Sequence, residues 1–325
     1  MTRWFLTLPL LLFPVIAHAA TLEVTAGHSI AQALSRLSSG DTLTIHAGTY
    51  AENNLTPPSG VTIEGAPGER VVLRPTGSTA PGFELAGVSN TTIRNLTVDG
   101  SGGAISYGIR IAGQNNTVEN VEVANVQNQG IAIYCAGGSN HQGCGHGGNT
   151  LRNDHVHGSG SGGCHGTTAR DGFCHGVYVY SDDNVIEGGE YDHNNGWGIQ
   201  TYGSNLTVTN VFVHDNVSGG IVASGTAIQV SNTVVMDNDP SGQNGGVWVG
   251  DGSVLKDVTI SAHANAIVGG GIAQENVRVN GQGGSGAHLV PGQTIVATVQ
   301  PSLPPAALQP STPPAPRNFR VISLP

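Results

Sequence analysis

The chain has 325 residues and a formal net charge of −10, and Lys256 is its only lysine. Bulk electrostatics therefore disfavour nucleic acids and anionic membrane surfaces as partners. With 49 glycines and only 10% charged residues, the composition suits tight turns and stacked strands better than a helical core.

Residues 1–19 predict a cleaved secretory signal peptide. Arg3 precedes an apolar run at 5–13, and the segment ends in Ala17-His18-Ala19. A charged start, a short apolar core and a small-residue end are typical of such signals, and the run is too short to span a membrane. We therefore expect a secreted or periplasmic protein without membrane insertion.

The segment after the signal predicts a short amphipathic helix within residues 28–37. Its apolar residues Ile30, Ala33, Leu34 and Leu37 follow helical spacing, and extended segments follow at 40–50. Such a helix would cover the open end of a stack of strands, which would otherwise expose unpaired edges to aggregation.

A repeat of about 22 residues organises the middle of the chain. The strand Gly176-Val177-Tyr178-Val179-Tyr180 returns as Gly198-Ile199-Gln200-Thr201-Tyr202, and similar strands headed by glycine lie at 108–111, 130–134, 220–224 and 246–249. A second strand runs in phase with the first, each time after an asparagine: Asn95, Asn120, Asn153, Asn210 and Asn232.

A period this short leaves no room for helices, so each repeat is one coil whose strands pair in parallel with the coils above and below. The sequence thus predicts an all-β fold, a right-handed parallel β-helix, over residues 20–298. Isoleucine and valine point into the core, and the alternate residues form outward columns with a step of about 4.8 Å. The proline-rich residues 299–325 predict a linker and a C-terminal tail.

Two inserted loops interrupt the repeat between Gly130 and Gly176 and contain all four cysteines. In an exported protein disulfides are expected, and three pairings are possible. We favour Cys135–Cys144 and Cys164–Cys174, because each bond would close its own loop. The alternative is a zinc site that combines cysteines with His141, His146 or His165.

The loops flank the coil that begins at His175, and this coil carries the candidate site. The outward residues and those just before the strands predict a substrate-binding surface of Tyr134, Trp197, Gln200 and Tyr202 beside Tyr178 and Tyr180. Tyrosine rings on a rigid sheet offer flat faces to sugar rings and hydroxyls for hydrogen bonds. The alternative is an aromatic ladder that only stabilises the stacked strands.

The repeats from about residue 60 to about 280 resemble the pectate-lyase-like superfamily, which includes lyases, hydrolases, epimerases and non-catalytic surface proteins. The segment 175–180 is similar to the Tyr-Gly-Phe-Asp-Pro-His motif of uronan epimerases. His175, Tyr178 and Tyr180 stand at the positions of its tyrosine, aspartate and histidine, so none of the three family residues is retained. The resemblance therefore implies where a site would lie, and it does not imply epimerase activity.

Cleavage of a uronate by β-elimination needs a neutralised carboxylate, a base for the C5 proton and an acid for the leaving oxygen. We assign the base to His175, the acid to Tyr178 or Tyr180, and the neutralising cation to Arg170. Asp182 and Asp183 are candidate Ca²⁺ ligands, and the alternative for them is a turn.

The carboxylates just named and a second outward column each allow more than one interpretation. The adjacent carboxylates Asp182 and Asp183 are similar to those of polygalacturonase-like hydrolases, whose companion motifs are missing at neighbouring coils. A second outward column contains His157, Asp192 and His214, with His155 and Glu190 two residues earlier. It predicts metal binding or proton transfer, or else a solvated polar ladder. Asn194, Asn216 and Asn238 predict a structural asparagine ladder.

We therefore predict an exported, monomeric, carbohydrate-active protein, a polysaccharide lyase-like enzyme that acts on extracellular uronic-acid-containing glycan by β-elimination. The alternatives are a non-catalytic glycan-binding or surface protein, favoured by the acidic charge and by the lack of a complete catalytic motif, and a glycoside hydrolase or uronan epimerase.

Overall fold

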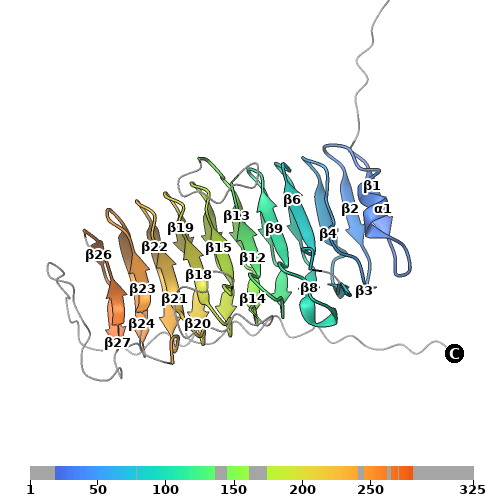
Figure 1. The fold of residues 1–325 in the computed structure, drawn as a ribbon. Coiled ribbons are helices and arrows are strands. Elements are labelled where there is room, and N and C mark those ends of the chain that lie inside the picture. The colour runs from blue at the N-terminus through green and yellow to red at the C-terminus, as the bar shows by residue number, and fades with distance from the viewer. Residues whose placement is uncertain are drawn as a thin grey trace, which may run out of the picture.

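The computed structural model describes residues 19–77, 79–135, 145–160, 174–240, 245–261, 265–269 and 271–280. These residues form the predicted right-handed parallel β-helix, whose coils follow one another along a single axis (Figure 1). A sheet of 19 strands, the large sheet, covers two sides of the coil, and a sheet of eight strands, the small sheet, forms the remaining side.

The large sheet contains two rows of parallel strands. Its first row consists of β1 (Thr21–Val24), β2 (Thr42–Ile45), β4 (Thr62–Gly65), β7 (Thr92–Arg94), β10 (Thr117–Glu119), β13 (Thr150–Arg152), β16 (Val185–Glu187), β19 (Thr207–Thr209), β22 (Gln229–Met236), β24 (Val254–Ser261) and β26 (Ala273–Glu275). Its second row consists of β3 (Gly48–Tyr50), β5 (Val71–Leu73), β8 (Thr97–Asp99), β11 (Glu122–Ala124), β14 (His155–His157), β17 (Glu190–Asp192), β20 (Phe212–His214), the later halves of β22 and β24, and β27 (Arg278–Asn280).

The small sheet has one strand per coil. Its strands are β6 (Phe83–Ala86), β9 (Ile109–Ala112), β12 (Ile131–Ile133), β15 (Val177–Val179), β18 (Trp197–Thr201), β21 (Gly219–Ala223), β23 (Gly245–Val249) and β25 (Asn265–Val268). A short 3₁₀ helix, η1 (Gly100–Gly102), follows β8.

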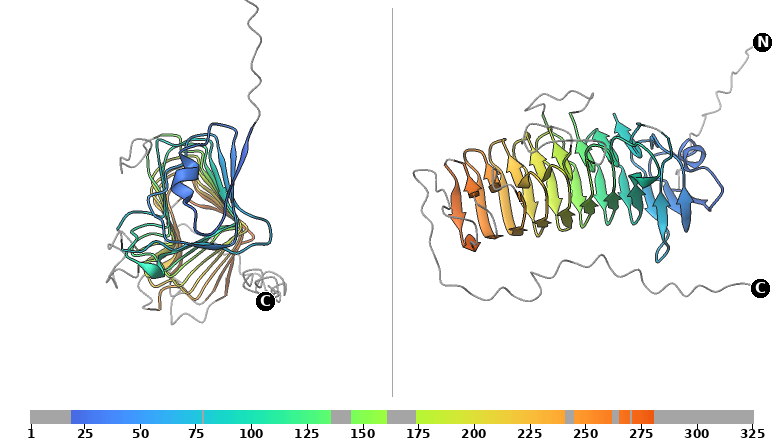
Figure 2. Two further views of the ribbon diagram at one scale, coloured as in Figure 1. Left: turned by 90° about the vertical axis from the view of Figure 1, so that its right-hand side faces the viewer. Right: turned by 60° about the horizontal axis from the view of Figure 1, so that its bottom comes forward.

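The N-terminal helix, α1 (Ile30–Leu34), is shorter than the predicted range but lies where expected. Ser29 caps it by accepting a hydrogen bond from the Gln32 amide, and Ile30 and Leu34 are buried in the core. Seen along the axis, the helix lies across the opening of the first coil (Figure 2). It therefore covers the end of the stack.

The repeated glycine at the start of the small-sheet strands is required because neighbouring side chains lie too close to its backbone for a Cβ atom to fit. A Cβ atom at Gly108 would collide with the side chain of Val123, and one at Gly130 would collide with that of Val156. Both valines belong to the buried column of the second row. The repeated glycine thus lets the coil turn tightly around its own core.

The asparagine that precedes most second-row strands is explained by its backbone conformation. Asn95, Asn120, Asn153, Asn210 and Asn232 all have positive φ, between 47° and 58°. Asparagine adopts this left-handed conformation more readily than most residues. The next residue then enters the core, as Leu96, Val121 and Val211 do.

Two buried asparagine ladders run along the coils. The predicted ladder of Asn194, Asn216 and Asn238 is confirmed, because the Asn194 backbone N–H donates to the Asn216 amide oxygen and the Asn216 backbone N–H to that of Asn238. A second ladder, of Asn116, Asn149 and Asn184, repeats the pattern at the corner before the first-row strands β10, β13 and β16.

Cys135 and Cys174 are disulfide-bonded, whereas Cys144 and Cys164 lie outside the described residues, so the favoured pairing stays a prediction. The predicted signal peptide up to residue 18 and the predicted tail lie outside them too. Within the described ranges, none of the helices is long and apolar enough to cross a membrane.

Candidate functional site

Five tyrosines cluster on the outer surface of the small sheet, and we call this surface the tyrosine face: Tyr107, Tyr134, Tyr178, Tyr180 and Tyr202. The rings of Tyr134 and Tyr180 stack at 5.8 Å between centroids, and those of Tyr180 and Tyr202 at 5.2 Å. Tyr178 meets Tyr180 edge to face at 4.9 Å. Tyr180 and Tyr202 are half-buried, so each residue is partly exposed to solvent.

Three hydroxyls of this face are held in the protonated form by burial. Burial raises the pKa of Tyr134, Tyr178 and Tyr202, because a low-dielectric environment disfavours the phenolate. The Tyr178 hydroxyl donates to that of Tyr180 at 2.7 Å. These hydroxyls can therefore donate hydrogen bonds to a ligand, and they are poor bases.

His175, the predicted base, is only 2% exposed and stacks on Tyr178 at 5.4 Å between centroids. Its Nδ1 accepts a hydrogen bond from the Trp197 backbone N–H at 3.0 Å, which places the proton of the neutral ring on Nε2. Nε2 is buried without a hydrogen-bond partner among the described residues. Burial also lowers the pKa of His175 to about 3. In this arrangement His175 is a hydrogen-bond donor, with no lone pair available to take a proton.

The two other predicted binding residues of these coils are largely enclosed. Trp197 is 1% exposed, and its ring lies over Gly219, where a Cβ atom would collide with it. The ring therefore has no free face for a sugar in this structure. Gln200 is buried too; its Nε2 donates to the Tyr202 hydroxyl at 3.0 Å, and its Oε1 is unpaired within the part of the chain that the structure describes.

A cation borders the tyrosine face at a position that sequence reasoning missed. The Arg110 guanidinium lies 5.2 Å from the centre of the Tyr134 ring and contacts both carboxylate oxygens of Glu84 at 2.8 Å. Arg110 pairs with Ala132, which pairs with Tyr178, so the strand register could have revealed it. Arg170, the predicted neutraliser, lies outside the described residues.

The predicted calcium ligands Asp182 and Asp183 take part in turn contacts. Asp182 accepts a hydrogen bond from the Ser204 amide at 2.7 Å. Asp183 has a φ of 60° and bonds with His146 at 2.8 Å and Asn205 at 3.0 Å; these bonds lower its pKa. This is the geometry of the turn alternative, and the calcium role stays a prediction.

A second polar surface lies on the second row of the large sheet, and we call it the histidine ladder: Glu122, His155, His157, Glu190, Asp192 and His214. The strand register places His157, Asp192 and His214 in one column, as expected, and Glu122, His155 and Glu190 in the adjacent one. The hydrogen bonds, however, run diagonally between the columns.

Three histidine–carboxylate pairs make up these diagonals. His155 Nε2 lies 2.7 Å from Asp192 Oδ1, His157 Nε2 lies 3.2 Å from Glu122 Oε1, and His214 Nε2 lies 2.8 Å from Glu190 Oε1. The hydrogen bond from His157 lowers the pKa of Glu122. Burial opposes the charge on His155, but the bond to Asp192 and the nearby carboxylates raise its pKa overall.

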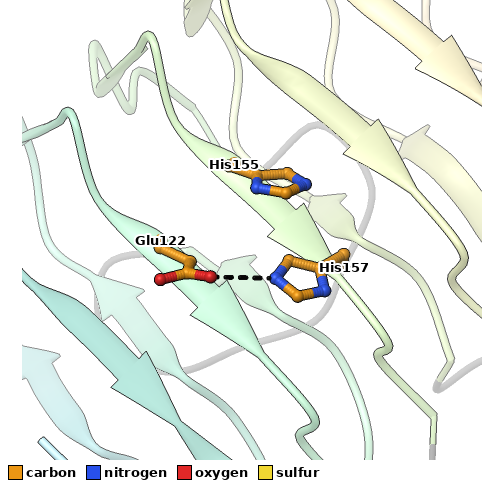
Figure 3. Close-up of side chains that lie close together, drawn as sticks. All are labelled: Glu122, His155 and His157. Carbon is orange, nitrogen blue, oxygen red and sulfur yellow. Dashed lines mark hydrogen bonds and ion pairs between the residues drawn. The ribbon is translucent and has the colours of Figure 1, made fainter. Parts of the chain in front are cut away.

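Two groups within the ladder have the spacing of metal ligands: Glu122, His155 and His157, and His155, Glu190 and Asp192. In each group one ligand atom from every residue lies within 4.8 Å of the others. Figure 3 shows the first group, in which the two imidazole rings lie one above the other beside the Glu122 carboxylate.

Comparisons with known proteins show the fold. A family model described as a right-handed beta helix region matches residues 81–296. A comparison with curated protein sequences finds no match. The solved structure of pectate lyase Pel9A is 16% identical with a TM-score of 0.55, and the match covers 82% of this chain and 78% of that one. The ORF18 protein of Geobacillus virus E2 is 14% identical with a TM-score of 0.53, and 77% of this chain matches 55% of its length. The resemblance to the pectate-lyase-like superfamily is thus confirmed at the level of the fold.

Proposed function

The chain belongs to the right-handed β-helix family, and on this premise we propose that it is an exported carbohydrate-active protein that binds extracellular polysaccharide on its tyrosine face. The observation that carries the proposal is the stacked, half-buried pair of Tyr180 and Tyr202, whose rings are 17° from parallel. Flat rings fixed on a rigid sheet suit the apolar faces of sugar rings, and their hydroxyls suit sugar hydroxyls.

The surface continues along the solenoid beyond the tyrosines. Trp248, on β23, is 42% exposed and belongs to the same outward column as Tyr178 and Gln200 through the register of β15, β18, β21 and β23. Strands in this column follow one another at about 4.8 Å. A glycan chain that runs parallel to the axis would therefore meet Tyr202 and then Trp248.

We further propose that the glycan contains uronic acids, and Arg110 supports this choice. Its guanidinium carries a positive charge beside Tyr134, and its side chain is 26% exposed. A sugar carboxylate could share the guanidinium with Glu84, because arginine offers several donors in a planar fork.

Cleavage by β-elimination is the second candidate. The observation in its favour is the donor pair of Tyr178 and Tyr180, whose hydroxyls lie 2.7 Å apart and could protonate a leaving oxygen. Elimination also needs a base, and neither His175, whose Nδ1 is occupied, nor Tyr178, whose pKa is raised, provides one in this arrangement. Binding is therefore the primary proposal.

Tyr180→Ala and Tyr202→Ala are each expected to weaken glycan binding about tenfold, which corresponds to about 1.4 kcal/mol for a lost ring contact. Isothermal titration calorimetry with polyuronate and neutral oligosaccharides would measure this. Phe212→Ala, an aromatic change on the large sheet, is the control and should leave the affinity unchanged. Equal affinity in wild type and both tyrosine variants would contradict the proposed surface.

The reaction is tested by proton NMR of the same glycans before and after incubation with the mature protein, with and without Ca²⁺. Signals of unsaturated ends would establish elimination, and Arg110→Gln should then reduce it for uronates. Unchanged spectra from a glycan that the calorimetry shows to bind would establish a binding protein.

A further inference from the structure

Glu122, His155 and His157 project together from the second row of the large sheet. Glu122 and His155 are direct partners in the register of β11 and β14, and His157 follows His155 by two residues on the same side of its strand. All three side chains are half-buried, and the backbone that carries them is paired on both sides. Their arrangement is therefore set by a rigid sheet (Figure 3).

The ligand atoms are close to the spacing that a metal ion requires. Zinc binds nitrogen and oxygen at about 2.0–2.2 Å in a tetrahedron, which separates two ligand atoms by about 3.3 Å. His157 Nε2 and Glu122 Oε1 already lie 3.2 Å apart. The ligand atoms of the group all lie within 4.8 Å of one another, so side-chain rotation is enough to close it.

His155 contributes a second, independent observation. Its Nε2 bonds to Asp192 Oδ1 at 2.7 Å, and Nε2 therefore carries the proton that the carboxylate accepts. The other ring nitrogen, Nδ1, is buried and has no hydrogen-bond partner in the described ranges. A buried nitrogen without a partner is costly, whereas a histidine that binds a metal through one nitrogen commonly donates its other N–H to a carboxylate.

The alternative group of His155, Glu190 and Asp192 is less suited to an ion. His214 bonds to Glu190 and His193 bonds to Asp192, so both carboxylates are already engaged by imidazoles from outside the group. This group also offers one imidazole instead of two, and nitrogen donors are what distinguish transition metals from calcium.

From these contacts we infer that Glu122, His155 and His157 bind one divalent transition-metal ion of the zinc type, with Asp192 as the positioning residue for His155. Three protein ligands leave one position of a tetrahedral ion open to water or to an oxygen of a bound molecule. The site belongs to the large sheet, so it does not depend on the tyrosine face.

The test uses the mature protein after treatment with EDTA, titrated with Zn²⁺ alone in a calorimeter. We expect one equivalent to bind, and His157→Asn and Glu122→Gln each to weaken binding at least tenfold. Asp192→Asn should weaken it about 10- to 100-fold. His46→Asn is the control, because His46 also lies beside two carboxylates, Glu23 and Glu69, but has no second histidine with them.

A Co²⁺ titration adds a readout of the coordination itself, since visible absorption bands of a bound Co²⁺ should appear in the wild type and be lost in His157→Asn. Thermal unfolding in EDTA checks that each variant is folded. If a histidine variant does not fold, the conservative Glu122→Gln variant still tests the site. The inference is overturned if the wild type shows no saturable Zn²⁺ binding, or if folded Glu122→Gln and His157→Asn bind as tightly as the His46→Asn control.

Discussion

Replacing Asp154 with asparagine is expected to stabilise the protein, and by more as the pH rises. Asp154 occupies the corner position that Leu96, Val121 and Val211 fill in other coils, and it is completely buried. Its Oδ1 accepts the Val121 amide at 2.9 Å, while Oδ2 has no partner in the described part of the chain. Burial raises the pKa of Asp154 to about 8, because the charged form loses its hydration.

The direction of this pH dependence follows from the number of protons that the folded and unfolded states hold. An unfolded aspartate has a pKa of about 3.9, so between pH values of about 4 and 8 the folded state holds a proton that the unfolded state has lost. The free energy of unfolding therefore falls by about 1.4 kcal/mol per pH unit in this window and levels off above the folded pKa. Asparagine keeps the shape and the oxygen acceptor but does not titrate.

Urea unfolding of Asp154→Asn and wild type at pH values of about 5 and 7.5 measures the effect. The difference between the two proteins should widen by about 3 kcal/mol between these pH values. Asp251→Asn removes an exposed carboxylate in a turn and serves as the control, because its effect should change little with pH. A gap between wild type and Asp154→Asn that is the same at both pH values would show that Asp154 is ionised in the folded protein.

The fold follows from the sequence because its constraints are local and repeat. The glycines at the head of small-sheet strands such as β9 and β12 are needed because a valine side chain lies against them, and the asparagines at most second-row corners are favoured by their positive φ. Both features recur along the coils, so the repeat in the sequence predicts the parallel register. The inserted loops broke that period but did not change the register of β12 with β15.

The candidate sites follow only in part, because the repeat predicts which side chains point outward and not what covers them. Trp197 precedes the outward residues of its coil in the sequence, yet it is buried and packs over Gly219 in the next coil, and His175 is enclosed by its bond to the Trp197 backbone and by the Tyr178 ring. Sequence spacing alone cannot show such burial.

The histidine ladder shows a related limit. Reading the sequence by columns groups His157 with Asp192 and His214, whereas the structure pairs His157 with Glu122 in the adjacent column. On one face of a sheet, diagonal neighbours are about 7–8 Å apart at their backbones, within reach of long side chains. Side-chain length and direction therefore decide the pairs.

Asn216→Ala is expected to destabilise the protein strongly, because Asn216 is the central member of a buried ladder. Its Nδ2 donates to the Tyr191 carbonyl at 2.8 Å and to Asn238 Oδ1 at 2.8 Å, and its Oδ1 accepts the Asn194 amide at 3.1 Å. Asn216 is fully buried, so water cannot replace these bonds without entering the core.

Truncation leaves the Asn194 N–H and the Tyr191 carbonyl without these partners, and each buried unsatisfied group costs about 1–3 kcal/mol. We expect the free energy of unfolding to fall by about 3 kcal/mol or more, measured by urea denaturation at constant pH. The matched control is Asn195→Ala, which lies next to the ladder but outside it: Asn195 is exposed, and its side chain bonds to the Gly160 carbonyl alone among the described residues. Losses of similar size in the two variants would mean that the asparagine ladder contributes no more than a surface hydrogen bond. A loss confined to Asn216→Ala would instead show that the asparagine ladder is a principal support of the corners that position the histidine ladder and the tyrosine face.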